Sequence, residues 1–115
     1  MSNNNINKTS YGYDVTWIET EWYTSKILVF EGKGGRTPVT FHKDTTKSWF
    51  INNGTFKVTY IDTSDGKLYA KELGEGIVFH VPALMPVGLE CITETGSIAE
   101  TSNKNDPKDC YRLSS

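Results

Sequence analysis

The chain has 115 residues, a formal net charge of −2 and a pI near 5.6, and its lysines are scattered along the sequence. This charge gives no field that would attract nucleic acid phosphates. The sequence also contains neither a secretory signal nor an apolar run long enough to span a bilayer. We therefore expect one cytoplasmic domain with neither nucleic acid nor membrane as a partner.

Residues 1–10 are polar and rich in asparagine, and they carry too little apolar surface to offset the entropy of ordering them. We expect a flexible tail there, followed by a single domain over residues 11–113. That domain consists of short β-branched and aromatic runs broken by turn signals. The predicted strands are 14–21, 25–32, 37–43, 47–52, 55–62, 67–73, 76–82 and 88–94. Their regular spacing predicts an all-β sandwich or barrel.

Two dipeptides between predicted strands have the composition of tight turns. Asn53-Gly54 and Asp65-Gly66 each end in a glycine, which tolerates a positive φ angle. Each is predicted to form a hairpin tip that pairs its two neighbouring strands.

The two cysteines, Cys91 and Cys110, lack the CxxC spacing of a metal or redox site. In a chain without a secretory signal, two cysteines are more often reduced than bridged. We expect free thiols.

Two blocks of the sequence carry a family resemblance. Residues 34–56 read GGRTPVTFHKDTTKSWFINNGTF, and residues 74–90 read GEGIVFHVPALMPVGLE. Together they resemble the two cupin motifs, especially those of the small single-domain branch similar to the C-terminal (type II) cupin domain of mannose-6-phosphate isomerases. The matching residues are Gly35, His42, Trp49, Phe50, Gly54, Gly76, His80, Val81 and Pro82. The resemblance spans roughly residues 11–113 and implies a single-domain, antiparallel, jelly-roll-like β-barrel whose mouth holds the site.

The resemblance also implies where a metal would bind, and this chain departs from that pattern. In metal-binding cupins the first block supplies two imidazole or amide ligands and a carboxylate, and the second block supplies another imidazole. Carried over position by position, these ligands become Thr40, His42, Lys47 and Val87. One good ligand remains, and the ammonium of Lys47 opposes a cation. We therefore expect a degenerate metal site and no cofactor.

A slip of the alignment by one or two residues leaves a second possibility open. A divalent transition metal is then held at a rebuilt site by His42, Asp44, His80 and Glu90. Otherwise His80 is expected on a barrel strand, outside the ligand set.

The lysine in place of a carboxylate suggests a different ligand. If Lys47 points into the barrel mouth, its charge favours a small polar anion such as a sugar phosphate or carboxylate. The predicted ligand-binding residues are Arg36, Thr40, His42, Lys47 and Trp49, with His42 as a hydrogen-bond donor or catalytic acid and base. The alternatives are a solvated loop lysine at position 47 and a buried structural imidazole at position 42.

Two other functions stay open at this point. The first is an enzyme similar to sugar-phosphate isomerases, in which His42 moves a proton; it depends on family analogy. The second is a dimeric interaction scaffold, with the apolar stretch 81–89 as its contact surface. A homodimer is expected in either case.

Overall fold

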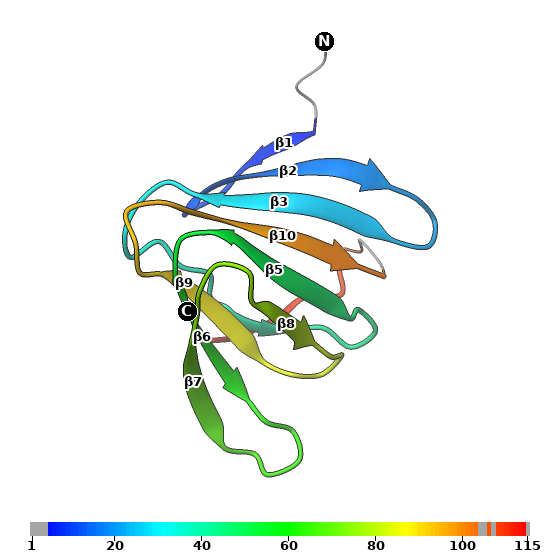
Figure 1. Cartoon of the computed structure of the whole chain (residues 1–115). Coiled ribbons are helices and arrows are strands. Elements are labelled where there is room, and N and C mark those ends of the chain that lie inside the picture. The colour runs from blue at the N-terminus through cyan, green and yellow to red at the C-terminus, as the bar shows by residue number, and fades with distance from the viewer. Residues whose placement is uncertain (1–4, 104–105, 107, 115) are drawn as a thin grey trace.

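The computed structural model describes residues 5–103, 106 and 108–114, and this part of the chain forms eleven strands in two antiparallel sheets (Figure 1). The six-stranded sheet consists, in spatial order, of β1 (Ile6–Lys8), β2 (Gly12–Glu19), β3 (Thr24–Phe30), β10 (Gly96–Ser102), β5 (Lys47–Asn53) and β8 (Val78–Val81). The five-stranded sheet consists of β11 (Tyr111–Ser114), β4 (Val39–Phe41), β9 (Val87–Cys91), β6 (Phe56–Ile61) and β7 (Leu68–Leu73). Within the described ranges there is no helix that could cross a membrane.

All eight predicted strands are present, and two further strands belong to the six-stranded sheet. Strand β1 pairs with β2, so the structure differs from the predicted flexible tail at Ile6–Lys8. Residues 1–4 of that tail lie outside the described residues. Strand β10 pairs with β3 on one side and with β5 on the other, which makes it a central strand of the sheet.

The two predicted hairpin tips have different outcomes. The turn at Asp65-Gly66 joins β6 to β7, which pair with each other, so this prediction is confirmed. The turn at Asn53-Gly54 joins β5 to β6, which belong to different sheets, so the predicted hairpin is wrong. Gly54 nevertheless needs to be glycine, because its φ angle is 85° and a Cβ atom there would lie 2.6 Å from the Thr93 hydroxyl oxygen.

The core lies between the two sheets and is filled from alternate strand positions. On β6, Phe56 and Val58 are fully buried, whereas Lys57 between them is exposed. One ring contact joins the two sheets: Phe30 of β3 meets Phe56 of β6 edge to face, with ring centres 4.9 Å apart. Cys91 is buried in this core and Cys110 is exposed, so the prediction of free thiols is confirmed.

The apolar stretch 81–89 is mostly part of this core. Val81, Val87 and Leu89 are each 3% exposed and Met85 is 8% exposed. These four side chains are therefore unavailable to a second copy, whereas Leu84 in the same stretch is 56% exposed, so a dimer contact there stays a prediction. The homodimer itself stays a prediction.

Candidate ligand-binding cavity

A cavity of about 260 Å³ lies between the two sheets and receives side chains from both. The four positions that correspond to metal ligands in cupins all line it: Thr40, His42, Lys47 and Val87. Strand pairing explains this convergence, because Thr40 of β4 lies opposite Val87 of β9. As a donor set, these four residues do not fit a divalent transition metal, since His42 is the only imidazole and Lys47 is a cation.

Lys47, the first residue of β5, points into the cavity. Its side chain is 15% exposed, its Nζ atom lies 3.6 Å from Oε1 of Glu100, and it sits 5.3 Å from the centre of the Trp49 ring. The alternative of a solvated loop lysine is therefore wrong. Trp49 shares the same face of β5, since strand side chains alternate, and it forms a buried wall of the cavity.

Glu100 is a buried acid in the cavity wall that no motif in the sequence indicates. It lies on β10 opposite Trp49 of β5 and Lys26 of β3, and its side chain is 10% exposed. Trp49 Nε1 donates a hydrogen bond of 2.8 Å to Oε1 of this carboxylate. Burial raises the pKa of Glu100, but Lys47, the Trp49 hydrogen bond and Lys26 together hold it below its ordinary value. Glu100 is thus an ionised, buried acid between two lysines.

His42 lines the cavity directly after β4. Its carbonyl oxygen accepts a 2.6 Å hydrogen bond from the Leu84 N–H, which fixes the backbone at this point. Burial lowers the pKa of His42, and the charge of Lys47 lowers it further, while Asp109 and Glu100 act in the opposite direction. The imidazole is therefore neutral at neutral pH, with one ring nitrogen as donor and the other as acceptor.

Asp109 holds the loop between His42 and Lys47 in place through hydrogen bonds. Like Glu100, it lies outside the two motifs of the sequence. Its carboxylate accepts hydrogen bonds from the backbone N–H groups of Lys43 at 2.8 Å and Asp44 at 3.0 Å. It also accepts one from the Thr45 hydroxyl at 2.9 Å. Desolvation raises the pKa of Asp109, but these three hydrogen bonds outweigh it and lower the pKa to about 2. The loop geometry that positions His42 and Lys47 therefore depends on a charged Asp109.

This arrangement predicts a pH dependence of stability. The pKa of Asp109 falls from 3.8 to about 2 on folding, so its contribution is fully present above about pH 4 and is lost as the pH falls through about 2. We expect Asp109→Asn to be less stable than the wild type at neutral pH and to show a shallower loss of stability below about pH 4. Urea unfolding followed by tryptophan fluorescence across this pH range measures both effects. Asp44→Asn is the control, because the Asp44 side chain is exposed; equal slopes for wild type and Asp109→Asn would contradict the assignment.

The remaining predicted site residues lie away from the cavity. Arg36 bridges Glu90 through its backbone and lines a separate hollow with Lys57, so its predicted place at the barrel mouth is wrong. His80 is exposed on the outer face of β8, where its Nδ1 atom lies 2.7 Å from the Ser48 hydroxyl oxygen.

The structure also does not assemble the alternative metal set of His42, Asp44, His80 and Glu90. His42 faces the cavity, whereas Asp44 and His80 are exposed and Glu90 lines the hollow beside Arg36. In the ranges 5–103 and 108–114, no three His, Cys, Asp or Glu side chains are grouped as metal ligands.

Comparison with known proteins shows which solved structures share this fold. No protein-family model and no curated protein matches the sequence. Among solved structures, the chain is similar to the capsular polysaccharide assembling protein CapF from Staphylococcus aureus, with a TM-score of 0.83 and 14% identity over 96% of this chain and 32% of that one. It is also similar to oxalate decarboxylase from Bacillus subtilis, with a TM-score of 0.83 and 16% identity over 94% of this chain and 29% of that one.

A third similar structure belongs to a protein of a different kind. Peruvianin-I, a cysteine peptidase from Thevetia peruviana latex, has a TM-score of 0.70 and 19% identity over 81% of this chain and 56% of that one. The chain spans about a third of the length of CapF and of oxalate decarboxylase. At these identities the likeness concerns the fold and not the activity. The chain therefore has the cupin fold, an all-β architecture of two antiparallel sheets that matches cupin structures.

Proposed function

We propose that the cavity binds a small polar molecule that carries a carboxylate or phosphate group, without a tightly bound metal. The observation that carries this proposal is the pair of lysines beside one buried acid: Lys26 and Lys47 both act on Glu100. Two ammonium groups therefore lie beside one carboxylate, and each can donate a further hydrogen bond to an anionic group of a ligand.

Two further residues of the cavity supply complementary groups. Asp14, which is 8% exposed, lines the cavity from β2, and His42 contributes a neutral imidazole. With Asp14 included, the charges of the two lysines and the two acids in the cavity wall balance. A ligand with hydroxyl or amino donors in addition to its anionic group therefore suits the site better than a bare anion. The volume of about 260 Å³ lies just below the usual range of roughly 300–1,000 Å³ for small-molecule pockets, which favours a single sugar phosphate or a small carboxylic acid.

The name of one similar protein agrees with a small carboxylate as ligand, and the name of another refers to a carbohydrate. Oxalate decarboxylase is named for a small dicarboxylate, and CapF is named for capsular polysaccharide assembly. These names support the choice of compounds and nothing finer, because the identities are 16% and 14%.

A thermal-shift titration tests the proposal with mannose 6-phosphate, glucose 6-phosphate, malate, citrate and oxalate, and with glucose as the uncharged control. A ligand that binds only the folded state at about 100 times its Kd stabilises it by about 2.7 kcal/mol, which corresponds to a rise in Tm of about 10 °C. We expect Lys26→Gln to weaken the binding of any responding anion about tenfold. Lys57→Gln, on the exposed face of β6, is the matched control and should leave binding unchanged. Unchanged melting temperatures with all five anions would overturn the proposal.

An isomerase-like enzyme is the second candidate, and the neutral imidazole of His42 in the cavity is the observation that favours it. Such a group would take a proton from a carbon next to a carbonyl. Product analysis after incubation with the two sugar phosphates tests this candidate. Turnover that persists unchanged in His42→Ala would remove it.

A further inference from the structure

A second hollow, separate from the cavity between the sheets, lies on the surface at one end of the six-stranded sheet. It has a volume of about 580 Å³. The β2–β3 turn, the start of β5 and the ends of β8 and β10 meet there, at the right of Figure 1. We call this hollow the end groove. Its lining residues include Trp22, Tyr23, Lys47, Ser48, His80 and Thr101.

One side of the end groove is formed by two aromatic rings on a rigid turn. Trp22 is 72% exposed and Tyr23 is 41% exposed. Their backbone is nevertheless fixed, because the Thr20 hydroxyl oxygen accepts hydrogen bonds of 3.1 Å from the N–H groups of both residues. An exposed tryptophan on a hydrogen-bonded turn presents an apolar face to a partner.

The other side of the end groove is polar and equally well fixed. The His80 ring is oriented by the 2.7 Å contact of its Nδ1 atom with the Ser48 hydroxyl. The Thr101 hydroxyl is held 3.0 Å from the Ser25 hydroxyl. Hydroxyl and imidazole groups both donate and accept hydrogen bonds, so this side suits a partner with many hydroxyl groups.

We propose that the end groove binds a neutral oligosaccharide, with a sugar ring stacked on Trp22 and its hydroxyl groups bonded to the opposite side. A sugar has an apolar C–H face and a polar rim, and these two surfaces match the two sides of the groove. A protein partner fits less well, because its apolar anchors would face hydroxyl groups across from Trp22. An anion fits less well too, because Lys47 is the only lysine or arginine among the described lining residues, whereas the cavity has two lysines.

The end groove and the cavity share Lys47, which lines both. The two sites are otherwise built from different residues. Binding in the end groove is therefore an additional function, and its argument does not rest on the proposed ligand of the cavity.

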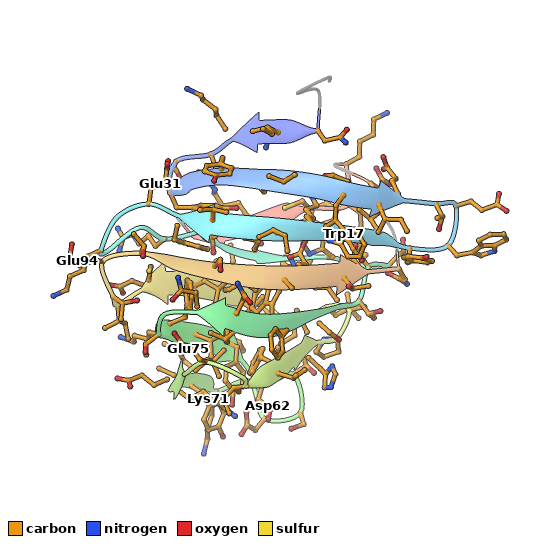
Figure 2. The ribbon with its side chains drawn as sticks, turned by 45° about the horizontal axis from the view of Figure 1, so that its top comes forward. Trp17, Glu31, Asp62, Lys71, Glu75 and Glu94 are labelled. Carbon is orange, nitrogen blue, oxygen red and sulfur yellow. The ribbon has the colours of Figure 1, made fainter. Side chains whose placement is uncertain are left out.

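Isothermal titration of the full chain with maltotriose, cellotriose, xylotriose and chitotriose tests the proposal. We expect at least one trisaccharide to bind and to change the tryptophan fluorescence, and Trp22→Ala to weaken that binding about tenfold or more. Trp17→Ala is the matched control. Trp17 is 62% exposed on β2, lies over the broad face of the sheet in Figure 2, and does not line the groove.

The remaining outcomes separate this site from the cavity. Lys26→Gln should leave trisaccharide binding unchanged, because Lys26 lines the cavity and does not line the end groove. Absence of binding by all four trisaccharides would overturn the proposal, as would equal affinities of Trp22→Ala and the wild type. Light scattering covers the other occupant of the groove, a second copy of the chain. If the wild type self-associates, binds none of the sugars, and loses its self-association in Trp22→Ala, the groove is a contact between copies and the proposal is overturned.

Discussion

Replacing Glu100 with methionine is expected to lower the free energy of unfolding by about 3 kcal/mol. The substitution removes the acceptor of the Trp49 N–H and leaves the Lys47 ammonium inside the barrel without its counterion. Removal of one partner from a buried ion pair costs about 3–5 kcal/mol, and the lower end applies because the Lys47 side chain keeps 15% exposure. Urea unfolding at neutral pH, followed by circular dichroism, measures the change.

Two further variants identify the cause of this loss. Glu94→Met changes an exposed glutamate at the edge of the molecule (Figure 2), and its effect should stay within about 0.5 kcal/mol. The double variant Glu100→Met/Lys47→Met should lose less stability than the sum of the two single variants, because it leaves no unpaired buried charge. Strict additivity would show that the contact between Lys47 and Glu100 contributes nothing to stability.

Replacing Phe30 with alanine is expected to cost about 3–5 kcal/mol, the range for a large ring removed from a core. Phe30 has no exposed surface, stacks on Tyr11 with ring centres 4.1 Å apart, and meets Phe56 at 4.9 Å. The substitution would leave a cavity and remove the ring contact of Phe30 with Phe56 between the two sheets. Phe50→Ala is the matched control, because Phe50 is 44% exposed on the outer face of β5, and its loss should be about 1 kcal/mol or less. Similar losses for both variants in urea unfolding would contradict this account.

Alternation of apolar and polar residues makes a strand such as β6 predictable from the sequence. In β6, apolar and polar residues alternate, and each inward residue is apolar. Strand β10 escapes prediction because its inward residues include Glu100 and its outward residues include Ala99, so the pattern of side chains does not look half-buried. The Asn53-Gly54 turn is recognised as a turn but not as a crossing between sheets, because turn residues report local φ angles and not the pairing of the strands they join.

The candidate site is predictable as far as local alternation and the cupin resemblance extend. His42, Lys47 and Trp49 are all found from the first motif, and the structure brings them to one cavity. Arg36 does not line this cavity, because β4 begins at Val39 and the alternation of side chains that orients His42 does not extend back to position 36. Glu100 lies more than 50 residues from Lys47 in the chain, so their contact exists only through the pairing of β10 with β5. Such a contact has no local signal in the sequence.

The position of β10 between β3 and β5 has a consequence for how the chain reaches its native state. Residues 24–30 and 47–53 have no direct ladder with each other and are joined only after residues 96–102 arrive between them. During synthesis, β3 and β5 would each present an unpaired edge until most of the polypeptide had been made. Folding is therefore expected to be slow, with few structured intermediates before β10 docks, as is usual for topologies dominated by distant pairings.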